Sequence, residues 1–412
     1  MKPHILVMNR WPQYRNGRQW DHELCRYEDI LPGHCDVSYL CDEEGCTGLS
    51  GLIDPRRVSV IPDFGEIDSV VARVGRVIDE HGPITHLLAF SEYLLDPAAA
   101  VRQQFGIPGH RPADVDRFRD KIVMKRLLGA ANMRVPKWFS CDGNEDIERC
   151  ALELGFPLIL KPVRGASSEG VQKVESLDAL RGILATRDLK GFEIEEYVEG
   201  DIFHVDGVID AEGQFVFSSV SRYISSCLNF KSGSPLGSII QTESPLRSAC
   251  QSFANGCLQA LGLLASAFHL ELFHRDDELI FLEVGARVPG ADVPYVVHRT
   301  FGVNLFRLWA DVVLGRSASA PAVTASASGG WITIPRPVPL PRKVLSAKSL
   351  LGSIPGLYRE LIPVPGEILT DTGGGYTHMQ GGRFLIEGVN EADVQASIDA
   401  VRTRYMLETI PA

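Results

Sequence analysis

The chain has 412 residues, which is enough for about three domains of roughly 150 residues each. Hydrophobic residues make up 45% and charged residues 23%, a composition typical of folded globular proteins rather than disordered or fibrous ones. The formal net charge of −11 disfavours nucleic-acid backbones and anionic lipid surfaces as partners.

No apolar run of about 18 residues occurs, so we expect no membrane span. The first apolar stretch is too short for a signal peptide and reads as a β-strand. Nine cysteines, an odd number spread over a long chain, indicate free thiols rather than a disulfide framework. We therefore expect a cytoplasmic protein.

The N-terminal part alternates short apolar strands with helices. Strands are predicted at 5–8, 37–40, 58–61 and 85–90, and helices at 67–81 and 96–105. This alternation predicts an open parallel α/β sheet with crossover helices, and we place this domain at 1–112. One charged amphipathic helix is then predicted over 114–129, before a proline-marked return to extended chain.

The rest of the chain reads as α+β. The predicted strands are 158–162, 171–174, 192–197, 205–209, 215–220, 267–273 and 279–287, and the predicted helices are 176–186 and 244–261. The Ala/Ser-rich stretch 317–330 is predicted to be a flexible connection, and a small β-rich appendage closed by a helix over 391–405 to follow it. We accordingly divide the chain into domains 1–112, 113–200 (with its linker helix) and 201–412, with the appendage beginning at about 330.

A pair of acidic residues on neighbouring strands is the most informative local pattern. Alternation places His269 with Glu271, and Glu283 with Gly285 and Arg287, on one face of their strands. A hairpin centred on Asp277 sets Glu271 opposite Glu283, with Cβ atoms about 5 Å apart, where like charges need a cation between them. Two carboxylates with open positions suit Mg²⁺ shared with a nucleotide, whereas a different register would leave two solvent-facing glutamates.

Three further segments are less specific when taken alone. Lys161 ends an apolar strand and precedes a Gly/Ser-rich loop, 164–170, whose backbone can approach phosphate closely or can simply form a hairpin. Lys121 lies early in a helix, and the segment 193–201 runs from a strand of alternating acidic and apolar residues into a linker.

The order of these pieces resembles the ATP-grasp family over roughly residues 1–315. The resemblance implies an ATP-grasp fold with an N-terminal open parallel-sheet (pre-ATP-grasp) domain, a small central lid subdomain and a C-terminal catalytic α+β domain. It also implies ATP and Mg²⁺ as cofactors, with Mn²⁺ as an alternative ion. The implied nucleotide contacts are Lys121 and Lys161, the loop residues Ser167 and Ser168, and the adenine hinge Glu195, Glu196, Tyr197 and Val198.

The same resemblance implies that Glu271 and Glu283 hold the metal and that Arg287 steadies an acyl phosphate and the tetrahedral intermediate. One position departs from the family: Gly285 stands where an asparagine ligand is usual, which puts a second metal ion in doubt. The segments 268–273 and 283–290, with Phe90-Ser91-Glu92, look most like bacterial dipeptide-forming amino acid ligases. The function implied is ATP-dependent joining of two amino acids through an acyl phosphate, releasing ADP and phosphate.

Four residues are candidates for the substrate end, and three of them have a simpler alternative. His269 contacts the acceptor amino acid or assists amine deprotonation, or is an ordinary hydrogen-bonding strand histidine. Arg222 binds a substrate carboxylate or is surface charge, and Glu92 recognises an amino group or is a helix N-terminal acid. Gly290 shapes a side-chain pocket.

Two other functions stay open: an ATP-grasp ligase or carboxylase acting on a different carboxylate, and a non-catalytic ATP-binding regulator. We expect amino acids as small-molecule substrates, no nucleic acid and no membrane, and, by family analogy, a homodimer.

Overall fold

The computed structural model describes residues 2–11, 23–51, 53–142, 146–165, 169–225, 228, 230, 233–318, 327–370 and 381–412. Within those ranges, no helix combines the length and apolarity needed to cross a bilayer. None of the eight described cysteines is joined in a disulfide.

The N-terminal sheet is parallel, as predicted. Its strands, in the order β3-β2-β1-β4, are β3 (Val58–Val60), β2 (Asp36–Cys41), β1 (His4–Asn9) and β4 (His86–Ala89). The helices of this part are α1 (Tyr27–Ile30), α2 (Glu43–Thr47), α3 (Ile67–His81) and α4 (Leu95–Phe105). Every residue of β1 is buried, because both faces of a parallel sheet are covered.

The linker between the first two sheets holds two helices, so the prediction of one helix over 114–129 is wrong. They are α5 (Pro112–Arg119) and α6 (Lys121–Ala130). Asp120 separates them in an extended conformation (φ −103°, ψ 109°), and its side chain accepts hydrogen bonds from the backbone N–H groups of Ile122 and Val123. Asp120 is therefore the N-cap of α6, and Lys121 becomes the first residue of that helix.

The central part is a four-stranded antiparallel sheet, which we call the lid sheet. Its strands, in the order β5-β8-β6-β7, are β5 (Trp138–Ser140), β8 (Phe192–Glu196), β6 (Leu158–Pro162) and β7 (Gln172–Val174). Its helices are α7 (Ile147–Leu154) and α8 (Leu177–Leu184).

The largest sheet is antiparallel and has eight strands; we call it the main sheet. In spatial order they are β13 (Glu278–Gly285), β12 (Ser266–Arg275), β9 (Asp201–Ile209), β10 (Phe215–Tyr223), β11 (Leu236–Ile240), β14 (Ser328–Ile334), β18 (Gly382–Gly388) and β16 (Leu357–Leu361). The helices of this part are α10 (Pro245–Leu261), α11 (Val293–Phe301), α12 (Leu305–Val313) and α13 (Glu391–Arg404).

The C-terminal segment differs from the expected appendage. β14, β18 and β16 extend the main sheet, because β14 pairs with β11. A small separate sheet has the order β17-β15-β19, with β17 (Ile368–Leu369), β15 (Arg342–Ala347) and β19 (Leu407–Pro411), so a strand rather than α13 ends the chain. The predicted connection 317–330 lies outside the described residues over 319–326, and its last three residues belong to β14.

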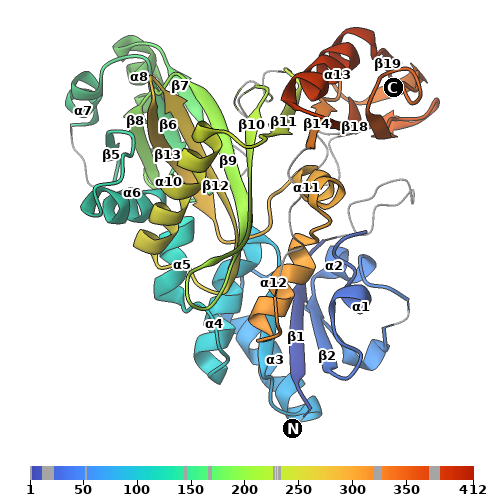
Figure 1. Ribbon diagram of the computed structural model, residues 1–412. Helices are drawn as coiled ribbons and strands as arrows, with labels where there is room; N and C mark the ends of the chain where they lie inside the picture. Colours follow the sequence, from blue (N-terminus) through green and yellow to red (C-terminus); the bar gives the residue numbers. More distant parts are fainter. Residues whose placement is uncertain are drawn as a thin grey trace.

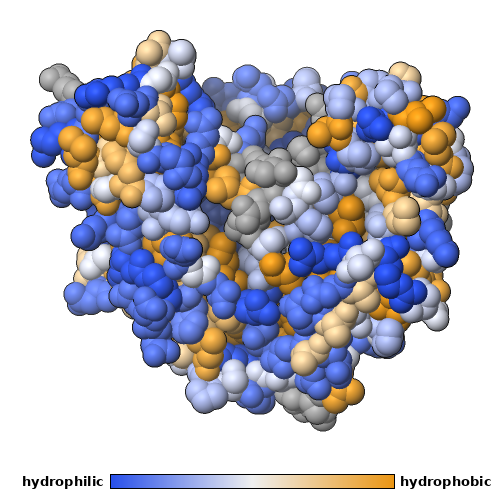
Figure 2. Space-filling model, turned by 90° about the horizontal axis from the view of Figure 1, so that it is seen from above, coloured by the Kyte–Doolittle hydropathy of each residue, from blue (hydrophilic) through white to orange (hydrophobic). Residues whose placement is uncertain are grey.

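Figure 1 shows the lid sheet and the C-terminal segment at opposite ends of the upper half, with the N-terminal sheet below them. α12 packs against β9 and β12 of the main sheet and against β4 of the N-terminal sheet. The ring of Trp309 on α12 lies 5.2 Å from that of Phe90, and Asn304 donates to the carbonyl of Leu24 over 2.8 Å. Seen from above, the surface is hollowed between the two upper parts, and hydrophilic residues cover most of this face (Figure 2). Beyond the ends of β4 and β13, Glu92 accepts a hydrogen bond from Arg287.

Candidate active site

Glu271 and Glu283 face each other across the β12–β13 ladder, as the sequence predicts. The hairpin that produces this register is not symmetric. Asp276 and Asp277 form a two-residue turn with positive φ values of 49° and 63°, which pairs Leu272 with Phe281. A bulge after that pair shifts the register by one residue and sets Glu283, instead of Leu282, opposite Glu271.

The two acids have different cationic neighbours. Glu283 forms an ion pair with Lys121, with 3.2 Å between Oε2 and Nζ. Glu271, only 7% exposed, accepts from Tyr223 Oη over 2.7 Å and from His269 Nε2 over 3.2 Å. Burial would raise the pKa of Glu271, but the hydrogen bond and charge of His269 outweigh it and lower the pKa to about 2.

The donor set fits a divalent cation. Among the described residues, Oε2 of Glu271 and Oε1 of Glu283 have no hydrogen-bond partner, so each acid keeps one oxygen available. Oxygen ligands from one or two carboxylates, completed by water and phosphate, are what Mg²⁺ prefers.

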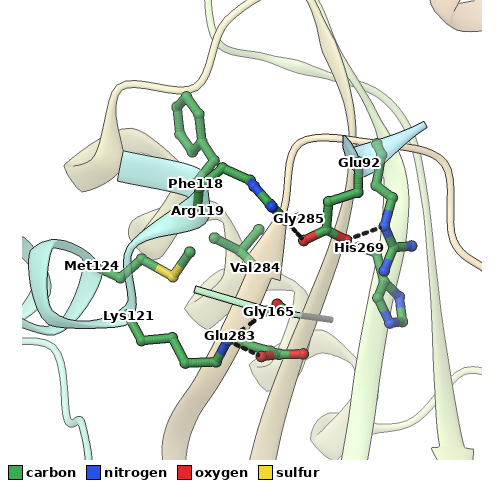
Figure 3. A pocket seen from close by; sticks show the side chains of 11 residues that line it. Glu92, Phe118, Arg119, Lys121, Met124, Gly165, His269, Glu283, Val284 and Gly285 are labelled. Carbon is green, nitrogen blue, oxygen red and sulfur yellow. Dashed lines mark hydrogen bonds and ion pairs between the residues drawn. The ribbon is translucent and has the colours of Figure 1, made fainter. Parts of the chain in front are cut away.

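Arg287 and Glu92 meet in a pocket that Glu283 also lines. Figure 3 shows Glu92 and Glu283 in this pocket. Arg287 donates from Nε to Glu92 Oε2 over 2.6 Å, and Arg119 donates from Nη1 to Glu92 Oε1 over 2.6 Å. Burial would raise the pKa of Glu92, yet the two guanidinium charges outweigh it and lower that pKa. Arg119 is a pocket residue that sequence reasoning missed. The lining residues are Glu92, Phe118, Arg119, Lys121, Met124, Gly165, His269, Glu283, Val284, Gly285 and Arg287.

Gly285 lies under the pair formed by Arg287 and Glu92. A Cβ at this position would lie 3.4 Å from Arg287 Cγ and 3.6 Å from Glu92 Oε2, which is ordinary van der Waals contact. A longer side chain would displace that ion pair. Gly290 borders the same guanidinium, since a Cβ there would lie 4.0 Å from Arg287 Nη1.

Four charged side chains form a buried cluster between α6 and the lid sheet. Lys125, fully buried, contacts Glu193 Oε1 at 2.7 Å and Glu195 Oε2 at 2.6 Å, while Lys161 contacts Glu195 Oε1 at 2.5 Å. Burial would lower the pKa of Lys161, but the two glutamates outweigh it and raise that pKa. Burial would raise the pKa of Glu195, but the two lysines hold it at about 2. Lys121 and Lys125 are four residues apart and lie on the same face of α6, one turn apart, so that Lys121 reaches the pocket and Lys125 reaches the cluster. Lys125 and Glu193 were not predicted from the sequence.

The remaining predicted nucleotide residues are only partly described. Ser167 and Ser168 lie outside the described residues. Before them, Lys121 Nζ donates to the carbonyl oxygen of Gly165 over 3.4 Å. After Glu195, the side chain of Glu196 turns to Arg134, Tyr197 carries Lys173 Nζ 4.4 Å above its ring, and Val198 is buried.

Arg222 does not reach the pocket. It precedes Tyr223 on β10, and because side chains alternate along a strand it points to the face opposite Glu271. Its guanidinium lies 3.4 Å from Gln395 of α13. A role for Arg222 in substrate binding stays a prediction that this geometry does not support.

Residues 154–294 match the family model described as ATP-grasp domain. The chain carries an ATP-grasp domain. Its fold as a whole is the ATP-grasp fold, because a crystal structure of L-amino acid ligase from Bacillus licheniformis matches 100% of this chain and 99% of that chain, with a TM-score of 0.72 and 17% identity. N5-carboxyaminoimidazole ribonucleotide synthetase from Thermotoga maritima shares the fold at a TM-score of 0.69 and 14% identity, matched over 100% of both chains.

Curated relatives of this chain include amino acid ligases. An L-arginine-specific L-amino acid ligase from Bacillus subtilis is 22% identical over 287 residues, which cover 68% of each protein. A D-alanine–D-alanine ligase from Clostridium perfringens is 33% identical over 138 residues, covering 30% of this chain and 46% of that ligase. The chain thus spans less than half the length of this second relative.

Proposed function

We propose that this protein is an ATP-dependent carboxylate–amine ligase that joins two amino acids. The observation that carries the proposal is one pocket lined by Lys121, Glu283 and Arg287, with Glu271 paired opposite Glu283 on the neighbouring strand. A site for nucleotide alone has little need of a partly buried guanidinium beside the metal-binding acids. Similarity to ATP-grasp ligases that act on amino acids supports the same reaction class.

The reaction proceeds in two steps. A carboxylate oxygen of the first amino acid attacks the γ-phosphorus of ATP, and the bond from that phosphorus to ADP breaks. The amine of the second amino acid then attacks the carbonyl carbon of the acyl phosphate, phosphate leaves, and the nitrogen loses a proton. The protein contributes positioning and the neutralisation of developing negative charge.

The residues divide these tasks. Lys121 and Lys161 bind phosphate oxygens, Ser167 and Ser168 belong to the loop above them, and residues 195–198 hold adenine. Mg²⁺, held by Glu271 and Glu283, neutralises phosphate charge when it is bound. Arg287 presents a planar fork to the acyl phosphate, which requires that it exchange its bond to Glu92 for one to the substrate.

Glu92 retains its proposed contact with a substrate amino group. Each of its carboxylate oxygens accepts one hydrogen bond from a guanidinium and keeps a second lone pair. The division into domains 1–112, 113–200 and 201–412, a cytoplasmic location and a homodimer also belong to this proposal, and light scattering of the purified protein measures the last of these.

A second candidate is a ligase or carboxylase of the same fold with a different carboxylate. It rests on the structural match to N5-carboxyaminoimidazole ribonucleotide synthetase. Bicarbonate dependence of ADP formation would favour this candidate.

The test is ADP release from ATP and Mg²⁺ with all pairs of the twenty L-amino acids, followed by mass spectrometry of the product. We expect ADP release that depends on two amino acids and yields their dipeptide. Folded protein that binds ATP but releases no ADP with any pair would contradict the proposal. Glu283→Gln is the matched control, because it removes charge with little change of shape.

A further inference from the structure

A chain of hydrogen bonds crosses three strands of the main sheet behind the acid pair. Asp206 on β9 receives His204 Nδ1 on Oδ2 at 2.5 Å and His269 Nδ1 on Oδ1 at 2.6 Å. His269 Nε2 continues to Glu271 Oε1 at 3.2 Å, and Tyr223 on β10 donates to the same oxygen over 2.7 Å. All five side chains are less than 10% exposed.

The sheet register explains why these residues meet. Asp206 pairs with His269, and His204 pairs with Glu271, so the four side chains form two adjacent rows on one face. Tyr223 lies on the same face, two residues beyond Ser221, which pairs with His204. Strand pairing therefore fixes the backbone position of each of the five residues in this series of hydrogen bonds.

The direction of each bond follows from the chemistry of the groups. An ionised carboxylate only accepts hydrogen bonds, so the histidine nitrogens that contact Asp206 and Glu271 carry the protons. Both ring nitrogens of His269 are engaged by carboxylates within the sheet, so neither is left to take a proton from an incoming amine.

The same three residues, His204, Asp206 and His269, are close enough to be considered as a metal site of their own. The distances argue against it. Two ligands of one tetrahedral zinc ion, each about 2.05 Å from the metal, lie about 3.3 Å apart. The observed nitrogen–oxygen distances of 2.5 and 2.6 Å are those of charge-assisted hydrogen bonds instead.

We propose that Asp206 and Tyr223 are positioning residues. Asp206 orients His269, and His269 and Tyr223 together hold Oε1 of Glu271, so that Oε2 of Glu271 faces the divalent cation. This inference rests on the proposed function, since it assumes that Glu271 is a metal ligand. It assigns His269 to the support of Glu271 and removes it as the base for the amine. Outer hydrogen-bond partners of metal ligands typically contribute about 10- to 100-fold in metal affinity.

The test measures Mn²⁺ binding by electron paramagnetic resonance, with and without ADP, in the full chain. The variants are Tyr223→Phe and Asp206→Asn, and the control is Tyr405→Phe, which also loses a 2.7 Å hydroxyl hydrogen bond, to the carbonyl of Gly381 in the C-terminal segment. We expect Mn²⁺ affinity to fall about tenfold or more in both variants and to stay unchanged in the control. Metal-free ADP affinity should stay unchanged in Tyr223→Phe, which a general loss of structure would not allow.

The outcomes separate the two claims. Wild-type protein that binds no Mn²⁺ in the presence of ADP would overturn both the proposed function and this inference. Wild-type binding that persists undiminished in Tyr223→Phe and Asp206→Asn would overturn the positioning role alone.

His269→Gln tests the assignment of that residue, with hydroxylamine as an acceptor that is already unprotonated at neutral pH. A supporting role predicts equal losses of ADP release with hydroxylamine and with an amino acid as acceptor. A loss confined to the amino acid would identify His269 as the base and contradict the inference.

Discussion

Replacing Lys125 by methionine tests whether the buried charge cluster stabilises the lid sheet. The substitution keeps much of the side-chain volume but removes the ammonium group that contacts Glu193 and Glu195 at 2.7 and 2.6 Å. Lys161 then remains alone, 2.5 Å from Glu195 and 3.8 Å from Glu193. One carboxylate is left without close compensation in a region that water does not reach.

Removing one partner of a buried ion pair typically costs about 3–5 kcal/mol of unfolding free energy. Because the Lys125 side chain is 0% exposed, solvent screening does not reduce this figure. The assay is urea unfolding followed by tryptophan fluorescence, to which Trp138 contributes with its ring centre 5.7 Å from Lys125 Nζ. ATP affinity should fall as well, since Glu195 begins the proposed adenine hinge.

Arg181→Met is the matched control, because Arg181 pairs with Glu148 at 2.8 Å beside the same sheet but is 53% exposed. An exposed pair of this kind is worth about 0.2–1 kcal/mol. If Lys125→Met costs no more than Arg181→Met, the reasoning about the buried cluster is refuted.

Three further substitutions bear on the site. Glu283→Gln should leave the melting temperature nearly unchanged and reduce Mg²⁺-dependent ADP release at least about 100-fold, because the metal loses a charged ligand; undiminished turnover would place the metal elsewhere. Lys161→Ala should weaken ATP binding, measured by calorimetry, more than amino acid binding, and an equal fall in both would contradict its assignment to phosphate. Glu195 has a pKa of about 2 in the folded protein and about 4.3 when unfolded, so its contribution to stability is complete above about pH 4.3 and is lost as the pH falls towards 2. Glu195→Gln should therefore flatten the dependence of unfolding free energy on pH over that range, and an unchanged slope would show that Glu195 is not held ionised.

The sequence predicts the acid pair because strand alternation and a short hairpin are local properties. Even there, the predicted pairing of Glu271 with Glu283 depends on both the turn and a bulge. The turn at Asp276 and Asp277 alone would set Glu271 opposite Leu282, and a bulge restores Glu283. The predicted hairpin centred on Asp277 also pairs Glu271 with Glu283, although no residue in the strand indicates the bulge.

Contacts between distant segments could not be predicted in this way. Lys125 reads as one more cation on a charged helix until the lid sheet places Glu193 and Glu195 against it. Arg119 is joined to Glu92 because α5 packs against α4, which follows Glu92 in the chain. The break at Asp120 was hidden because apolar residues continue with helical spacing on both sides of it, although aspartate is a common N-cap and was the available signal.

The central claim is that the acids and Arg287 serve phosphoryl transfer to a carboxylate. The direct measurement uses an amino acid labelled with ¹⁸O in both carboxylate oxygens, together with ATP, Mg²⁺ and a second amino acid, and determines the isotope content of the released phosphate. We predict one ¹⁸O atom in the phosphate for each dipeptide formed, because a carboxylate oxygen leaves with phosphorus. Phosphate free of ¹⁸O, released together with ADP, would contradict the account.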